Sequence, residues 1–193
     1  MARPSHRETL LTQGLSVVHE RGYGRASVRD IVQAAGVPQG SFTNHFSTKE
    51  AFGLEILELY YLNAKDGIVR TLRNDELDPL QRLRDFIDIQ IKVIAKDEMK
   101  RGCLFGNYSA EATDDNEGLR LRLVEIFDEV TASVEYCLKA AVKAGELPPR
   151  TRAGELAAFV ISSLQGAILL SKAYRSTTPI ERFKRILFSS VLA

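Results

Sequence analysis

The stretch "SVRDIVQAAGVPQGSFTNHFSTKEAF", residues 27–52, contains two short apolar patterns separated by a turn. Its second half is rich in proline, glycine, serine, threonine and asparagine, which are weak helix formers. Yet Phe42 and Phe46 stand four positions apart, which places both rings on one face of a helix. We therefore predict a short helix over 38–44 that is held by tertiary packing rather than by intrinsic propensity.

The residues before this helix complete a helix-turn-helix pattern. A first helix is expected over 27–34; it ends at the "GVP" turn, residues 36–38, and the second helix begins almost at once. Two helices joined at a steep angle by a tight turn that contains glycine define this motif. From Ile31 to Lys49 the chain has no Asp or Glu, so this segment carries no carboxylate that would repel phosphates.

The second helix is expected to turn the following residues outward: Gln39, Gly40, Ser41, Thr43, Asn44 and His45. Gln and Asn amides can pair with adenine edges, and a threonine methyl can touch a thymine methyl. Arg25, Arg29 and Lys49 are near in sequence and can neutralise phosphates. The pattern thus predicts a helix that enters the major groove of DNA. From the local pattern alone, the alternative is an ordinary helical corner of an all-α domain.

The composition is ordinary for a soluble globular chain. Of 193 residues, 45% are hydrophobic and 26% charged, and the formal net charge of +1 does not by itself indicate nucleic-acid binding. Cys103 and Cys137 match no disulfide or metal-ligand framework, which favours a reducing cytosol. The uncharged run from Leu156 to Ser171 is shorter than a membrane span. We expect a cytoplasmic protein with no metal, no cofactor and no membrane partner.

Helical periodicity extends through the rest of the chain. Apolar residues repeat at three and four positions, and no segment alternates with period two over the length of a strand. Ser47 and Glu50 have the spacing of a capping box, and Pro179 suits the first turn of the last helix. These signals predict an all-α fold of about nine helices, over residues 5–22, 27–34, 38–44, 48–73, 78–97, 103–112, 117–144, 152–174 and 179–190.

Residues 5–52 resemble the DNA-binding domain of the TetR family of bacterial transcriptional regulators. The resemblance is carried by the quoted stretch and by the end of the first helix, "VVHERGYGRAS". The residues in the family's register are Ala35, Gly36, Val37, Gly40, Phe42, His45, Phe46, Lys49 and Glu50. Two positions depart from the family pattern: Pro38 replaces a common serine, and Thr43 replaces a common aromatic residue that packs on the DNA backbone.

This resemblance implies a helix-turn-helix DNA-binding domain at residues 1–47 and a helical ligand-binding and dimerisation domain at 48–193. It also implies a regulator, in most cases a repressor, that binds a palindromic operator on double-stranded DNA as a homodimer. A small-molecule or electrophile inducer would release it.

The resemblance also implies roles for single residues. Ser27 and His45 would touch backbone phosphates, and Lys49 would contact a phosphate near the start of its helix. The residues expected in the groove are Gln39, Gly40, Ser41, Thr43 and Asn44. Arg29 joins the DNA-binding set through its charge. For His45 and Lys49, the alternative is an ordinary solvated surface position.

Helix 152–174 is apolar on nearly all sides, so it must be buried on more than one face. Small residues at Ser163, Gly166, Ala167 and Ser171 would let another helix approach closely. Together with helix 117–144 it is predicted to form a four-helix interface across a two-fold axis, which is the usual dimer of the family. The alternative is a single central helix in the core of one subunit.

The segment "MKRGCLFGNYSAEATDDNEGLRLRL", residues 99–123, places Cys103 at an expected helix start, after Lys100 and Arg101. Both features favour the thiolate. The segment is similar to a TetR subgroup that senses reactive electrophiles, and the alternative for Cys103 is a small buried hydrophobic residue. The candidate pocket residues, which could equally be simple core, are Tyr60, Tyr61, Phe86, Cys103, Phe105, Asn107, Tyr108, Phe127 and Gln165.

Nothing in the sequence favours catalysis. The chain has no HExxH motif, no nucleotide-binding glycine loop and no cysteine pair, and its three histidines all lie within the first 45 residues. We predict that the protein is not an enzyme; the alternative is an all-α small-molecule-binding enzyme on a similar scaffold.

Overall fold

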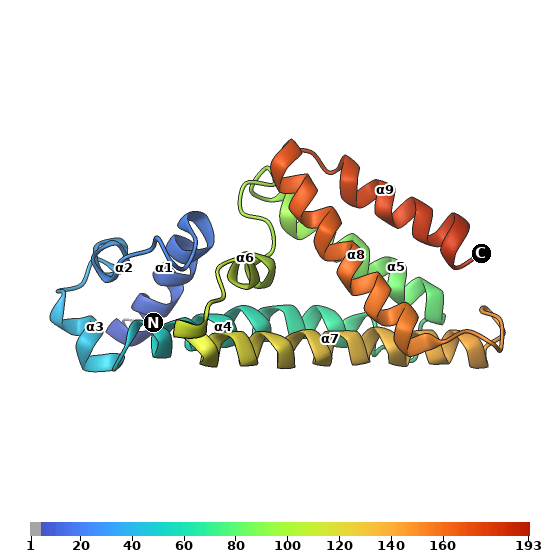
Figure 1. Ribbon diagram of the computed structural model, residues 1–193, viewed down its shortest axis with the longest axis horizontal. Helices are drawn as coiled ribbons and strands as arrows, with labels where there is room; N and C mark the ends of the chain where they lie inside the picture. The colour runs from blue at the N-terminus through green and yellow to red at the C-terminus, as the bar shows by residue number, and fades with distance from the viewer. Residues whose placement is uncertain (1–4) are drawn as a thin grey trace. The chain divides into compact units, whose positions relative to one another are not determined.

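The computed structural model describes residues 5–193, and every regular element in that range is helical (Figure 1). This confirms the all-α prediction, with helix ends displaced by a few residues. The nine α-helices of this range are α1 (His6–Arg21), α2 (Val28–Ala35), α3 (Gly40–His45), α4 (Lys49–Arg70), α5 (Pro79–Ala95), α6 (Leu104–Ala110), α7 (Glu117–Lys143), α8 (Ala153–Tyr174) and α9 (Thr178–Ile186). A short 3-10 turn (Asp114–Asn116) precedes α7, and a π-helical turn (Leu187–Val191) follows α9.

The helices pack into two compact units. The first unit comprises the residues up to Leu62 together with Leu104–Val124, and the second comprises Asn63–Cys103 and Glu125–Ala193. Helices α4 and α7 are long enough to contribute residues to both units. The expected boundary after residue 47 separates a DNA-binding domain from a ligand-binding domain by function rather than by compactness, and it stays a prediction.

Three aromatic rings form the centre of the N-terminal helices. The rings of Phe42 and Phe46 are 5.2 Å apart, and the ring of Phe52 from α4 lies 5.2 Å from the first and 5.0 Å from the second. All three side chains are buried, as is Ile31 of α2. The short helix α3 is thus held by its two anchors against α4, as the spacing of the phenylalanines predicts.

Capping side chains set the helix starts. Ser5 and Ser27 each cap their helix through a reciprocal capping box. Helix α4 is capped by Thr48, whose hydroxyl accepts the Ala51 N–H at 3.0 Å, so the expected Ser47 capping box is wrong by one residue. The Glu50 carboxylate accepts the N–H of Gly118 instead, at 3.2 Å.

A buried arginine closes the loop between α4 and α5 in the second unit. Arg82 is only 5% exposed; it donates to the Leu77 carbonyl at 2.7 Å and to the Asp75 carboxylate at 2.5 Å. The Tyr136 hydroxyl of α7 donates to the same carboxylate at 2.8 Å. These hydrogen bonds, chiefly that from Tyr136, lower the pKa of Asp75.

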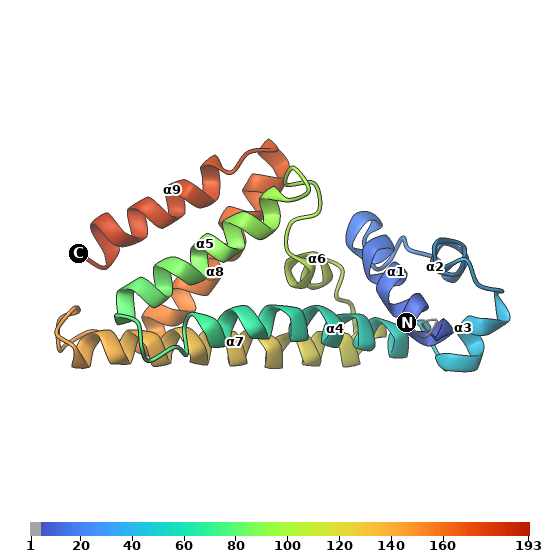
Figure 2. The same ribbon diagram turned by 180° about the vertical axis from the view of Figure 1, so that it is seen from behind.

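Helices α8 and α9 lie side by side in both views (Figure 1, Figure 2). One side of α8 is buried, but Leu169 and Leu170 on its other side are 65% and 51% exposed. Phe159 and Tyr174 of the same helix are exposed as well. A single subunit therefore leaves an apolar surface on α8 uncovered. By length and composition α8 would also suit a membrane span, although one such helix is weak evidence for that.

At Gly14 of α1, an added Cβ would collide with the ring of Phe52 of α4. We predict that Gly14→Ala lowers the free energy of unfolding by about 1–3 kcal/mol, because the ring has no free space to enter. Urea unfolding at one fixed protein concentration measures this. Gly40→Ala is the control, since a Cβ there would meet no atom within 4 Å. Equal stability of the two variants would contradict the prediction.

Candidate nucleic-acid interface

Helix α3 presents a polar surface to solvent. The side chains of Thr43, Asn44 and His45 are exposed, and Gln39 and Gly40 at the helix start are exposed as well. The Thr43 hydroxyl donates to the Gly40 carbonyl at 3.1 Å, which satisfies it within the helix. This surface provides amide, methyl and imidazole groups without a carboxylate, as recognition of DNA edges requires.

Ser41 is the exception among the expected outward residues. Its side chain is only 8% exposed, and its hydroxyl lies 3.3 Å from Nδ1 of His6 on α1. The expected outward orientation of Ser41 is therefore wrong, because α1 covers this side of α3. A contact between residues 35 positions apart leaves no signal in the local pattern.

The start of α2 places Ser27 and Arg29 at the surface. The Ser27 hydroxyl accepts the Asp30 N–H at 3.1 Å and is 2.6 Å from the Asp30 carboxylate. The Ser27 hydroxyl and backbone N–H both donate to the Asp30 carboxylate, and these two hydrogen bonds lower the pKa of Asp30. The same carboxylate pairs with Arg21 at 2.8 Å. The one acidic group of α2 is thus neutralised locally, while the Arg29 side chain is exposed.

Lys49 lies at the first position of α4, but its side chain folds back along the protein. Its ammonium is 4.6 Å from the ring centroid of Tyr23 and donates to the Gly24 carbonyl at 3.3 Å. Burial lowers the pKa of Lys49, and the charge of Glu111 opposes that shift. The expected phosphate contact stays a prediction.

Several pocket candidates gather in an aromatic cluster of the first unit. The ring of Phe105 on α6 is 4.9 Å from the ring of Tyr60 and 6.3 Å from that of Tyr61. His19 of α1 meets Tyr60 edge to face at 5.5 Å. The ring of Tyr108, also on α6, packs on the ring of Tyr23 at 5.2 Å. Asn107, the residue before Tyr108, is half-buried.

The other candidates belong to the second unit. Cys103, half-buried and one residue before α6, accepts a hydrogen bond from the Gln165 amide at 3.6 Å. Phe86 is buried and Phe127 half-buried. The thiol of Cys137 is also buried and donates to the Pro79 carbonyl at 3.0 Å. Burial raises the pKa of Cys137 to about 11, so the two cysteines differ sharply in their surroundings.

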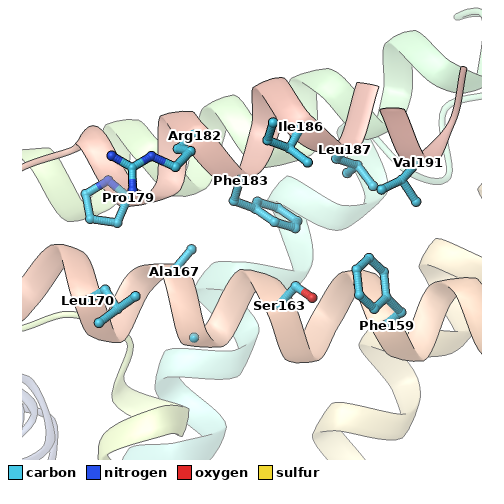
Figure 3. Close-up of a pocket in the computed structure, with 11 residues that line it drawn as sticks. Phe159, Ser163, Ala167, Leu170, Pro179, Arg182, Phe183, Ile186, Leu187 and Val191 are labelled. Carbon is cyan, nitrogen blue, oxygen red and sulfur yellow. The ribbon is translucent and has the colours of Figure 1, made fainter. Parts of the chain in front are cut away.

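An apolar cleft of about 440 Å³ lies between α8 and α9. Figure 3 shows the Phe183 ring of α9 and the Phe159 ring of α8 within it, with Ser163 and Ala167 along its floor. Ser163, Gly166 and Ala167, the small residues expected to let another helix approach, line this cleft. Its α9 side was not predicted, although the apolar spacing of Phe183, Leu187 and Val191 was a signal for it. In the described part of the chain, no three His, Cys, Asp or Glu side chains gather as a metal site would require.

Comparison with known protein families covers most of the chain. Residues 79–187 match the tetracyclin repressor-like C-terminal domain, and residues 10–56 match the bacterial regulatory proteins of the tetR family.

Three individual proteins are similar over nearly their whole length. The HTH-type transcriptional repressor DhaR of Mycobacterium sp. strain GP1 is 34% identical, with 100% of this chain and 95% of DhaR covered. The HTH-type transcriptional repressor NemR of Escherichia coli K12 is 29% identical, with 91% and 88% covered, and the crystal structure of its reduced form superposes with a TM-score of 0.83. The regulatory protein TetR from Rhodobacter sphaeroides has 30% identity and a TM-score of 0.87, with 93% of this chain and 95% of that one covered.

Proposed function

The chain belongs to the TetR family of bacterial regulatory proteins, and from this we infer that it is a transcriptional repressor which binds a palindromic operator as a dimer and is released by an inducer. The observation that carries this inference is the exposed, carboxylate-free surface of α3 behind its two buried phenylalanines. Its relatives are transcriptional regulators rather than enzymes. We propose that this protein is likewise not an enzyme and that it acts in the cytoplasm.

In the proposed complex, α3 lies in the major groove. Gln39, Thr43 and Asn44 face base edges, and Ser27, Arg29, His45 and Lys49 face phosphates. Two copies related by a two-fold axis would contact half-sites about one helical turn apart. Thr43 is shorter than the aromatic residue usual in the family, so its contact would be a methyl contact to a base rather than packing on the backbone.

We propose that residues 1–47 form the DNA-binding domain and residues 48–193 the ligand-binding and dimerisation domain, with α4 as the continuous connection. An inducer would release DNA by binding the state in which the two copies of α3 no longer fit successive major grooves. The affinity lost equals the difference in inducer binding between the two states. A hundredfold loss requires only about 2.7 kcal/mol of coupling.

The uncovered apolar surface of α8 supports a dimer interface there. Leu169 and Leu170 are exposed in one subunit, and the apolar cleft between α8 and α9 continues this surface. We propose that α9 joins α8 and α7 in the interface, because Ile186 at the end of α9 and Val191 in the following π-helical turn are also exposed.

Our first test of function concerns base recognition. Asn44→Ala should lower specific affinity by about 1–3 kcal/mol and relax base preference at one position of each half-site. Lys49→Ala should weaken binding to all sequences alike and flatten the salt dependence. Fluorescence anisotropy with DNA from upstream of the gene, and with a scrambled duplex, separates the two effects. Equal losses on both duplexes for Asn44→Ala would remove this residue from the base-reading set.

Assembly is tested on α8. Leu170→Glu should give monomers and a severe loss of operator affinity, because a charge cannot be buried unpaired in the interface. Leu62→Glu on α4 is the matched control, since that leucine is 61% exposed compared with 51% for Leu170. Analytical ultracentrifugation measures the oligomeric state of both variants. A monomeric Leu170→Glu variant with full operator affinity would refute the dimer model.

We propose Cys103 as the residue that an electrophilic inducer modifies. Cys103 is half-buried, whereas Cys137 is buried with the pKa of its thiol raised to about 11, so that Cys137 stays protonated at neutral pH. Cys103→Ser should bind operator normally and resist release by N-ethylmaleimide, while Cys137→Ser should be released like the wild type. Mass spectrometry of the labelled protein identifies the modified residue. If Cys103→Ser is still released fully, an ordinary reversible ligand is the better model.

A further inference from the structure

The segment that follows Cys103 is tied to the DNA-binding end of the first unit by a carboxylate. Glu111, just after α6, accepts the backbone N–H of Gly24 at 2.5 Å, across 87 positions of sequence. Gly22 in the same turn has φ +88°, and a Cβ there would collide with the Glu111 carboxylate. A Cβ at Gly24 would come within 3.3 Å of the same group. The turn between α1 and α2 is therefore shaped around this side chain.

Two further contacts join the same parts of the chain. The ring of Tyr108 on α6 packs against the ring of Tyr23 in the turn, at 5.2 Å. The Tyr108 hydroxyl is buried and has no hydrogen-bond partner among the described residues, so ring packing holds it. At the start of α7, the Gly118 N–H donates to Glu50 of α4, beside Lys49. Of the contacts made by Glu111, Tyr108 and Gly118, only that of Glu111 is a hydrogen bond to the backbone of the turn.

The position of this turn matters for the DNA-facing residues on both sides of it. The N–H of Ala26 donates to the Gly22 carbonyl at 3.1 Å, and the next residue, Ser27, is the cap of α2. The Gly24 carbonyl accepts the hydrogen bond from the Lys49 ammonium. A displacement of the turn would therefore move both the start of α2 and Lys49.

We propose that Glu111 is a positioning residue for operator binding, which fixes the turn between α1 and α2 and so sets the start of α2 and Lys49 for contact with DNA. It acts through the Gly24 N–H and does not itself touch DNA. This inference rests on the proposed function. It gives the segment that begins at Cys103 a connection to the DNA-binding helices that is separate from α4.

The sign of the effect distinguishes positioning from simple electrostatics. A carboxylate near bound DNA repels phosphates, so its loss on electrostatic grounds alone would tighten binding for Glu111→Ala and Glu111→Gln alike. A positioning role predicts the opposite for Glu111→Ala. Glu111→Gln keeps a carbonyl that can accept the Gly24 N–H, so it should restore most of the affinity.

The experiment compares the wild type, Glu111→Ala and Glu111→Gln by anisotropy with upstream DNA and by amide hydrogen exchange at Gly24. Glu111→Ala should bind roughly tenfold or more weakly than Glu111→Gln and exchange the Gly24 amide roughly tenfold faster. The unfolding temperature should stay within a few degrees of the wild type. Glu20→Ala, at an exposed position of α1, is the control, since it removes an equal charge from the same unit and should leave the Gly24 exchange rate unchanged.

Two results would overturn the proposal: tighter DNA binding by both Glu111 variants, or a Gly24 exchange rate in Glu111→Ala equal to that of the wild type. Failure of the proposed function looks different, because the wild type itself would then not bind the upstream duplex. In that case, an unchanged Gly24 exchange rate in Glu111→Ala would reject the role of the Glu111 contact as well. Faster exchange in this variant would establish that Glu111 stabilises the turn between α1 and α2.

Discussion

The packing of Phe42, Phe46 and Phe52 is the interaction on which the proposed DNA-binding surface of α3 depends. Helix α3 has six residues, rich in weak helix formers, and would not persist alone. Burial of Phe42, and of Phe46 at its C-terminal end, against Phe52 of α4 supplies the stability that its intrinsic helix propensity lacks. The outward positions are thereby released from any need to favour a helix, and they can be glycine, threonine, asparagine and histidine.

The features that could be predicted from the sequence are those that depend on residues close together in the chain. The helices, the helix-turn-helix and the buried phenylalanines follow from patterns within a few residues, namely the four-residue spacing and the caps. The inward turn of Ser41 and the folding of Lys49 onto Tyr23 could not be foreseen, because they depend on contacts across 35 and about 25 positions. The Thr48 cap was missed for a local reason, since Ser47 and Thr48 are both good caps and only the exact start of α4 decides between them.

In the candidate pocket, the sequence likewise predicts which residue types are buried but not which of them lie together. The aromatic candidates of α4 and α6 do lie together, since Phe105 contacts both Tyr60 and Tyr61. His19 joins them from α1 although nothing near it in sequence indicates an aromatic neighbour. Periodicity thus identifies which residues are buried, whereas the composition of a cluster is decided by how distant helices meet. For this reason Glu111 was absent from the predicted site: it stands in the segment that resembles the electrophile-sensing subgroup, but no local pattern indicates its contact with Gly24, 87 positions away.

Helix α8 connects the fold to the mode of DNA binding. Its apolar residues exceed what one subunit can bury, and neighbouring exposed apolar side chains of this kind are typical of an interaction site. If a second copy provides that cover, dimerisation and folding draw on the same apolar area, and the two copies of α3 are held at one separation. Binding free energy then comes from both half-sites together, so an inducer need not destroy either DNA-binding surface. A small change in the separation or tilt of the two copies removes the second half-site contact, and that is enough to release the operator.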